Sequence, residues 1–573
     1  MTKHSTAHYL LEGLMDAGIE YMFANFGTDH VSIIEELANW KQAGRRHPEV
    51  VICPHEVVAA HMAGGYAAMT GRGQAVMVHV DSGTANSAMS LHNLFRARLP
   101  VFLMAGKAPF TLHGELTGSR DNYVHFIQDP FDIASLVRPY VKWEYNLPSG
   151  VITKEVLQRG TAMMQSDPKG PVYLTLPRET LAEEWEEAAV KSFPKERYGA
   201  VSLGGTDAVR ARAIAEALLS AENPVAITCY LGRNPEAVAA LEELARSCGM
   251  KVAEFSPTSL NFPHDSPCFA GFDPGAAIAQ ADVGLLLDVD VPWLPKLVHD
   301  HPATRWLQVD VDAIKQDLPM WSFPVDVRVQ GDCATVLKQV LEIIRAEATP
   351  AFKTRAAARM VALEAAREKR QSSLAELAAR PGEVNAISPH YLCAMLNKVL
   401  GPDDVVVNEA IRNTPSVLNQ ITRTRPLSFH GPSGAGLGYS GGFALGVKLA
   451  RPQARVLQII GDGSYHFSAP TAVYAVAQQY RLPIFTVVLD NGGWSAVKTA
   501  VLSVYPKGTA LKTDDFQSRL LGKQRRFEQV AQAFGAHGEA VSDPKDLEAA
   551  IQRCLAALDQ GQAAVLNVQV TPL

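Results

Sequence analysis

The sequence predicts an α/β protein made of three doubly wound units, each built on a mainly parallel sheet. Three observations lead to this fold class. The chain has 573 residues, more than one hydrophobic core usually holds, so about two to four domains are expected. Short apolar runs alternate with segments of helical spacing, as in parallel sheets covered by helices. The composition, with 47% hydrophobic and 20% charged residues, is that of an ordinary globular protein.

The first unit is expected over residues 1–185. It opens with a helix pattern that Ser5 or Thr6 would cap. Strand patterns then alternate with helix patterns up to residue 177. The expected strands are 21–27, 49–54, 74–80, 99–106 and 170–177. This alternation predicts a doubly wound sheet.

Two further units follow. The second is expected over residues 200–345, with strands at 223–232, 251–255, 283–289 and 305–312. A highly charged helix pattern at 346–385 predicts a solvated helix that spans two domains. The third unit is expected over 386–573. Its segment "SGGFALGVKLARPQARVLQIIGDG" weakly repeats "AGGYAAMTGRGQAVMVHVDSG" of the first unit, as two copies of one α/β fold would.

Charge and cysteine usage exclude several classes of function. The formal net charge is −6 and no strongly basic block occurs, which disfavours nucleic acid or an anionic membrane as a partner. The seven cysteines are scattered without a CxxC pair, so neither a zinc site nor a disulfide framework is expected. We find no signal-peptide pattern and no apolar stretch of about 18 residues. A cytoplasmic enzyme is therefore expected.

Two apolar runs of the third unit each end in a polar group among glycines. "VLQIIGDGS" ends at Asp462, and "FTVVLDNGGW" ends at Asn491, with a helix-length segment between them. Ligands of parallel sheets bind beyond the carboxyl ends of the strands, so the two tips are expected to meet if the strands are neighbours. Carboxylate, amide and carbonyl oxygens suit Mg²⁺, and a helix N-terminus favours phosphate. The alternative is two ordinary strand-end turns.

The pair of motifs resembles the signature of thiamine-diphosphate enzymes. The resemblance implies that Asp462, Asn491 and the carbonyl of Gly493 ligate Mg²⁺. It also places Gly461, Gly463 and Ser464 against the cofactor. The family usually has Asn-Asn where this chain has Asp490-Asn491, so an additional charge lies beside a metal ligand.

Two more segments extend the resemblance. "PHEVVAAHMAGGYAAMTG" is similar to the family's pyrimidine-domain motif, which implies that Glu56 hydrogen-bonds the aminopyrimidine ring and so promotes loss of the thiazolium C2 proton. "GAGLGYSGGFALGVKLA" resembles the segment under the cofactor, where Leu437 would hold the two rings in a bent arrangement. Its glycines also fit G-x-G-x-x-G, but a dinucleotide fingerprint needs a strand directly ahead, and "FHGPSGA" is not one.

Substrate-facing residues are expected on the first unit. His79 lies where benzoylformate decarboxylase has a catalytic His, and it would act as a proton shuttle. Gln128 matches a Gln that acetolactate synthase and benzaldehyde lyase keep facing the cofactor. "FGTDH" places Asp29 and His30 on the first strand-end loop. For His79 the alternative is a core histidine facing a satisfied site.

The whole chain thus resembles the acetolactate synthase, benzaldehyde lyase and benzoylformate decarboxylase type of enzyme. The resemblance implies a carboligase or lyase that makes or breaks a C–C bond of a 2-oxo acid or 2-hydroxy ketone. A 2-oxo acid decarboxylase and a non-catalytic cofactor-binding protein are the alternatives. The resemblance also implies that a homodimer is the smallest working unit and that the protein forms a tetramer. Central domains of this family hold FAD or ADP in some relatives, but nothing in this sequence requires a nucleotide.

Overall fold

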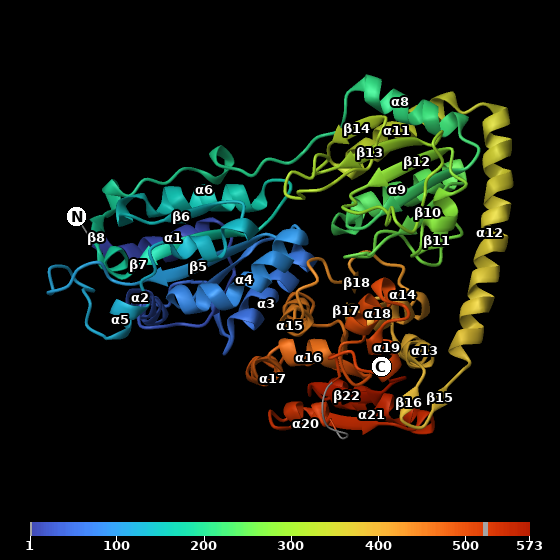
Figure 1. Cartoon of the computed structure of the whole chain (residues 1–573). Helices are drawn as coiled ribbons and strands as arrows, with labels where there is room; N and C mark the ends of the chain where they lie inside the picture. Colours follow the sequence, from blue (N-terminus) through green and yellow to red (C-terminus); the bar gives the residue numbers. More distant parts are fainter. Residues whose placement is uncertain (1–2, 520–524, 573) are drawn as a thin grey trace.

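The computed structural model describes residues 3–519 and 525–572, and it contains three α/β units, each with a six-stranded parallel sheet (Figure 1). This confirms the predicted fold class. The domain boundaries at 185, 200, 345 and 385 remain predictions. None of the helices in the described part of the chain is long and apolar enough to cross a membrane.

The N-terminal sheet has the strand order β3-β2-β4-β5-β7-β6. Its strands are β2 (Tyr21–Ala24), β3 (Glu49–Ile52), β4 (Gln74–Val78), β5 (Val101–Lys107), β6 (Glu144–Asn146) and β7 (Val172–Pro177). Its main helices are α1 (Thr6–Asp16), α2 (Val31–Gln42), α3 (Glu56–Thr70), α4 (Val80–Arg96) and α6 (Thr153–Gln165). Ser5 caps α1 by accepting the backbone N–H of His8.

Two details of this unit differ from the expectation. The strand expected over 74–80 ends at Val78, because α4 begins at Val80. The edge strand β6 was not expected, since its three residues, two of them exposed, carry little apolar pattern.

The central sheet follows the strand order 3-2-1-4-5-6 of Rossmann folds. Its strands are β9 (Pro224–Thr228), β10 (Lys251–Glu254), β11 (Phe269–Gly271), β12 (Val283–Leu287), β13 (Arg305–Asp310) and β14 (Val327–Gln330). The helices α8 (Ala208–Ser220), α9 (Pro235–Cys248) and α11 (Cys333–Glu347) cover it.

The C-terminal sheet has the order β18-β17-β19-β20-β22-β21. Its strands are β17 (Val405–Glu409), β18 (Phe429–His430), β19 (Val456–Gly461), β20 (Phe485–Asp490), β21 (His537–Val541) and β22 (Ala564–Gln569). The strands β19 and β20 are direct neighbours, so the two polar tips lie side by side as predicted. Between them the chain forms two helices, α16 (Asp462–Phe467) and α17 (Pro470–Gln479), because Pro470 cannot continue the first one.

The repeated segments of the two outer units pack against each other. The helices α3 and α15 (Ser440–Ala450) cross at glycines: a Cβ on Gly65 would lie 2.1 Å from the carbonyl oxygen of Phe443, and one on Gly446 would lie 2.0 Å from that of Met62. Only glycine permits so close an approach. The N-terminal and C-terminal units consequently share one hydrophobic core.

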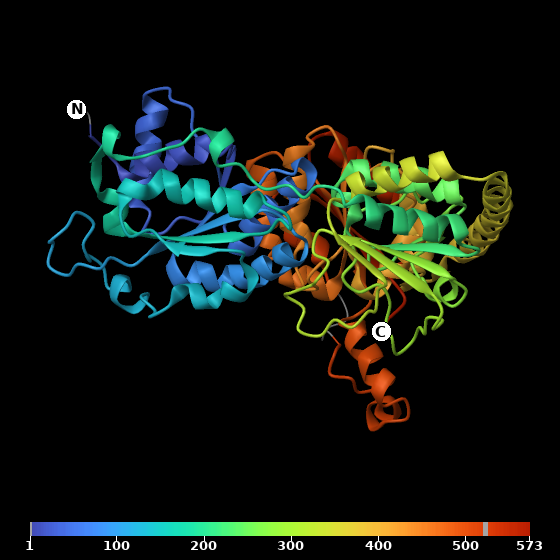
Figure 2. The same ribbon diagram turned by 90° about the horizontal axis from the view of Figure 1, so that it is seen from above.

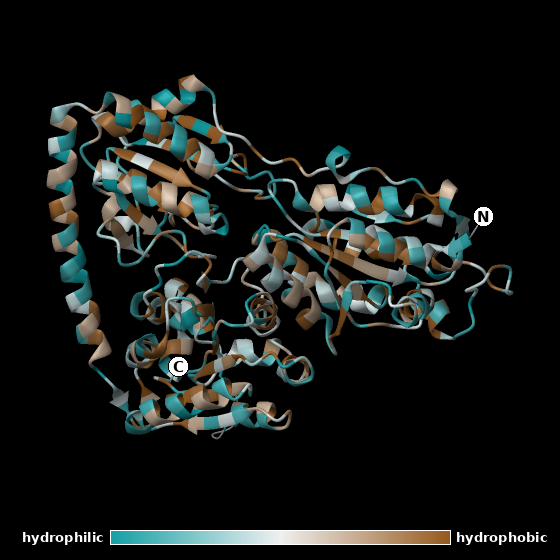
Figure 3. Ribbon diagram, turned by 180° about the vertical axis from the view of Figure 1, so that it is seen from behind, coloured by the Kyte–Doolittle hydropathy of each residue, from teal (hydrophilic) through white to brown (hydrophobic). Residues whose placement is uncertain are grey.

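Helix α12 (Pro350–Ala378) runs along the edge of the molecule past the central and C-terminal units (Figure 1). Hydrophilic residues recur along its whole length (Figure 3). Its buried residues are Phe352, Ala356 and Leu363. The helix therefore lies on the surface and connects the central and C-terminal units.

Candidate active site

Glu56 is the first residue of α3 and is buried at the carboxyl end of the N-terminal sheet. One carboxylate oxygen accepts a hydrogen bond from Asn25 Nδ2 (2.9 Å) and the other from Asn86 Nδ2 (3.1 Å). A Cβ on Gly83 would lie 3.3 Å from Oε1, so this glycine leaves room for the carboxylate. The two amides fix the orientation of Glu56, and Nδ1 of His55 lies 3.9 Å from its Oε2.

The predicted substrate-facing residues lie together beside α4. His79 is the residue directly before this helix, and its Nδ1 lies 2.5 Å from Oδ1 of Asp29. On its other side, His79 Nε2 lies 2.9 Å from Oε1 of Gln128. The ring of His30 is fully buried, with Nδ1 3.3 Å from Asp29 and accepting the backbone N–H of Gly27. The structure thus brings His30, His79 and Gln128 into one cluster around Asp29.

The cluster has a defined charge pattern. The hydrogen bond to Asp29 raises the pKa of His79 above its ordinary value. Burial acts to raise the pKa of Asp29, but the hydrogen bond from His79 and the charges of His79 and His30 together outweigh it, and the pKa is lowered. Burial lowers the pKa of His30. The protonated imidazolium is therefore more favoured at His79, and less favoured at His30, than in a free histidine.

Asp462, the first residue of α16, is buried beside the turn that follows β20. Its Oδ2 accepts the backbone N–H groups of Gly492 and Gly493, both at 2.8 Å, and Oδ1 accepts that of Gly463 at 2.9 Å. Gly492 and Gly493 have φ values of +90° and +138°, which side chains rarely adopt. Asn491 lies between Asp490 and this glycine pair, so the three predicted metal ligands meet at one turn.

The donor set of this turn fits a divalent cation. A carboxylate, an amide oxygen and a carbonyl oxygen are the hard ligands that Mg²⁺ prefers. Burial and the neighbouring charge of Asp490 raise the pKa of Asp462, so the two carboxylates repel each other. Oδ2 of Asp490 is buried without a hydrogen-bond partner among the described residues. A cation at this position would relieve the repulsion between the two carboxylates.

Leu437 is half-buried in the loop that precedes α15. The loop is held by Glu409, a buried residue at the end of β17, which accepts the backbone N–H groups of Gly438 (2.5 Å) and Ser440 (2.9 Å). Gly438 has φ +94°. Sequence reasoning did not identify Glu409, although it ends the apolar run "VVVNE" in the same way that Asp462 ends its strand. Asn25 and Asn86 were also missed, because nothing local marks them as partners of Glu56.

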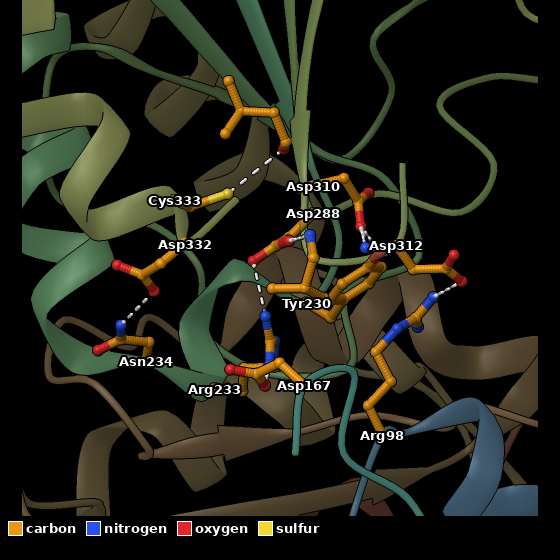
Figure 4. A network of polar contacts seen from close by, with 12 residues as sticks. Arg98, Asp167, Tyr230, Arg233, Asn234, Asp288, Asp310, Asp312, Asp332 and Cys333 are labelled. Carbon is orange, nitrogen blue, oxygen red and sulfur yellow. Dashed lines mark hydrogen bonds and ion pairs between the residues drawn. The ribbon is translucent and has the colours of Figure 1, made fainter. Parts of the chain in front are cut away.

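The strand ends of the central sheet bind the N-terminal unit (Figure 4). Lys315 Nζ lies 2.7 Å from Asp310, 2.8 Å from Asp290 and 2.5 Å from the hydroxyl of Tyr230. Arg98, just beyond α4, makes two hydrogen bonds to Asp290 and stacks over Tyr230 at 4.0 Å. These charges neutralise one another within the chain. The sequence did not indicate a nucleotide in this unit, and the question stays untested.

Comparison with known proteins decides the family. The family model "Thiamine pyrophosphate enzyme, N-terminal TPP binding domain" matches residues 4–136, and the model of the corresponding C-terminal TPP binding domain matches residues 413–568. The chain belongs to the thiamine pyrophosphate enzyme family. Thiamine pyrophosphate is another name for thiamine diphosphate. The Glu56 and His79 cluster lies within the first match, and the Asp462 turn within the second.

The similar proteins include decarboxylases and acetolactate synthases. Benzoylformate decarboxylase from Pseudomonas aeruginosa is 25% identical over 575 residues, covering 97% of both chains. The acetolactate synthase isozyme 3 large subunit from Escherichia coli is 23% identical and spans 99% of this chain and 95% of its own length. The crystal structure of benzoylformate decarboxylase from Polynucleobacter necessarius shares the fold, with a TM-score of 0.79 at 18% identity over both full chains.

Proposed function

We propose that this member of the thiamine pyrophosphate enzyme family is an Mg²⁺-dependent enzyme that makes or breaks a C–C bond next to a carbonyl group. Its substrate would be a 2-oxo acid or a 2-hydroxy ketone. The observation that carries the proposal is the grouping of a fixed carboxylate, Glu56, with the His79–Asp29–Gln128 cluster around the start of one helix. A non-catalytic cofactor-binding protein would have no use for this arrangement.

The binding residues divide between two units. Asp462, Asn491 and the Gly493 carbonyl would hold the metal, and the segment Gly461–Ser464 with Leu437 would hold the cofactor. When bound, thiamine diphosphate supplies an electron sink for the negative charge that develops at the carbonyl carbon. Glu56 would hydrogen-bond the aminopyrimidine ring, with Asn25 and Asn86 keeping its carboxylate in position.

His79 would donate protons to the substrate and accept protons from it. Asp29 fixes the ring through Nδ1 and stabilises its protonated form, which leaves Nε2 as the atom that exchanges a proton. In this structure Nε2 faces Gln128, which a substrate oxygen would replace. Gln128 would then be free to hydrogen-bond the substrate as well.

A 2-oxo acid decarboxylase is the second candidate. Decarboxylation ends when the carbon that has lost CO₂ takes up a proton, and a histidine with a raised pKa is a suitable donor. Similarity to benzoylformate decarboxylase favours this outcome. In a carboligase the same carbon would instead attack an acceptor carbonyl.

We also propose a homodimer as the smallest active assembly, with a tetramer built from it. Figure 2 shows two segments projecting from the body: the light-blue loop before α5 (Val124–Ile127) and the orange-red helices α18 (Ser495–Val504) and α19 (Thr509–Thr513). Both expose apolar side chains, including Tyr123 at 75% and Tyr505 at 65%. Exposed apolar surface of this kind favours contact with a second subunit.

A substrate panel tests the proposal. The protein, supplied with thiamine diphosphate and Mg²⁺, would be incubated with 2-oxo acids and acyloins, each with and without an acceptor aldehyde. CO₂ with aldehyde indicates a decarboxylase, acyloin formation a carboligase, and acyloin cleavage a lyase. No turnover of any substrate, together with no rise in melting temperature on adding cofactor and metal, would contradict the proposal.

A further inference from the structure

Position 490 holds an aspartate where the family usually has an asparagine. In the structure this aspartate pairs with an arginine. The Nε atom of Arg525 donates a hydrogen bond to Oδ1 of Asp490 at 2.8 Å, and Nη2 lies 2.8 Å from the same oxygen. The Asp490 side chain is fully buried, whereas that of Arg525 is 21% exposed. Asn567 on β22 anchors the arginine by donating to its backbone carbonyl at 2.8 Å.

The ion pair continues into the turn that carries the proposed metal ligands. Oδ1 of Asp490 also accepts the backbone N–H of Gly492 at 3.2 Å. The same N–H donates to Asp462. Asn491 lies between these anchored residues, and its Oδ1 accepts the N–H of Gly493 at 3.3 Å. A continuous path of contacts therefore leads from Arg525 to all three ligands.

We propose that Arg525 is a positioning residue of the metal site, which holds Asp490 and thereby keeps Asn491 and Gly493 in place to ligate Mg²⁺ beside Asp462. This inference rests on the proposed function. An asparagine at position 490 could accept the Gly492 N–H without any counter-ion. An aspartate adds a buried charge next to Asp462, and this charge requires a partner. Arginine suits the role because it stays charged at all relevant pH values.

A pair of this kind makes the two residues depend on each other. Without Arg525, the carboxylate of Asp490 would be left buried beside Asp462, free to rotate and to pull the Gly492 turn with it. Replacing Asp490 by asparagine removes the charge that needs Arg525. The two substitutions together should therefore be less harmful than Arg525→Met alone, which a double-mutant cycle measures.

Binding of Mn²⁺ in place of Mg²⁺ provides a readout apart from activity. Free Mn²⁺ would be followed by electron paramagnetic resonance in the presence of thiamine diphosphate, for the wild type, Arg525→Met, Asp490→Asn and the double variant. We expect Arg525→Met to weaken Mn²⁺ binding by about tenfold or more, as residues that orient metal ligands do. We expect Asp490→Asn and the double variant to stay within about threefold of the wild type.

Arg526→Met is the matched control. Arg526 is the next residue, is 52% exposed and pairs with Glu528 rather than with the metal turn, so its loss should leave Mn²⁺ binding unchanged. Unchanged binding in Arg525→Met, or a double variant as weak as Arg525→Met, would overturn the inference. If Arg525→Met does not fold, a tenfold loss between Asp490→Asn and the double variant overturns it, and equal affinities support it. A wild type that binds no Mn²⁺ with the cofactor would overturn the proposed function itself.

Discussion

Nδ1 of His79 lies 2.5 Å from Oδ1 of Asp29, which joins the strand-end loops of β2 and β4. The contact raises the pKa of His79 and lowers that of Asp29. The pair's contribution to stability is therefore lost as pH rises through the folded-state pKa of His79. It is also lost as pH falls through the folded-state pKa of Asp29, and between these limits it is present.

Replacing Asp29 should shift the pH dependence of the reaction. In Asp29→Asn the pKa of His79 should fall, because the imidazolium loses its carboxylate partner. If His79 is the proton donor, kcat falls as pH rises through this pKa, so the basic limb should move to lower pH. The pH profile of kcat measures this. An unmoved basic limb would show that another group donates the proton.

Glu56→Gln should lower kcat by about 10²–10⁴-fold, the usual contribution of a positioned acid or base. Gln keeps the size of the side chain, and one of its two amide contacts, so cofactor binding should persist. Stopped-flow turnover and cofactor-induced thermal stabilisation would be measured on the same preparation. Full activity would disprove the assigned role of Glu56.

Asp462→Ala should abolish the stabilisation that Mg²⁺ and thiamine diphosphate give together. At a ligand concentration of about 100 times Kd, the wild type should gain about 2.7 kcal/mol. The variant should gain almost nothing, because the carboxylate that binds the Gly492–Gly493 turn and would ligate the metal is gone. Melting curves with and without both ligands give the result, and an unchanged shift would place the metal elsewhere.

Glu409 should make the stability of the protein depend on pH. Burial raises the pKa of its carboxyl group from 4.5 to about 7. Its stabilising contribution is therefore fully present below the unfolded-state pKa and is lost as pH rises through about 7. Glu409→Gln removes this pH dependence. Between pH 4.5 and 8, the free energy of unfolding of the wild type should therefore fall by roughly 2–3 kcal/mol relative to that of the variant. Urea unfolding at several pH values tests this, and parallel curves would contradict it.

Arg98 and Arg96 provide a matched pair of variants at one interface. Arg98 is 7% exposed and pairs with Asp290 and Asp312. Arg98→Met should cost about 3–5 kcal/mol, because Lys315 would then be the one cation described here that faces this group of carboxylates. Arg96 is bound to Asp317, which is 28% exposed, so Arg96→Met should lower the free energy of unfolding by about 1 kcal/mol or less. Denaturant unfolding of both variants compares them. Equal effects would mean that the Arg98–Asp290 pair does not hold the two units together.

The sequence predicted the elements whose signals are local. The apolar runs before Asp462 and Asn491 are strands, and their neighbouring positions in the sheet follow from the short crossover between them. It could not predict the Arg525–Asp490 pair, because the two residues are 35 positions apart and an arginine in a polar segment carries no pattern. The oddity of Asp490 was visible in the sequence, but its partner was not.

The clustering of His30, His79 and Gln128 was expected only through resemblance. His79 and Gln128 are 49 positions apart in the sequence, so helix or strand periodicity could not predict that they meet. The two amides on Glu56 and the Glu409 anchor depend in the same way on tertiary packing. Sequence patterns report burial and turn geometry, whereas long-range polar pairs appear only when the strand order brings their loops together.

The two outer sheets have the same strand order, and corresponding positions in them differ in chemistry. The residue directly after the third strand is His79 in one unit and Asp462 in the other, and the residue after the fourth is Ala108 in one and Asn491 in the other. Equivalent edges of the same architecture thus present an imidazole in one unit and the proposed cation ligands in the other, so the two units would supply the two halves of the proposed catalyst.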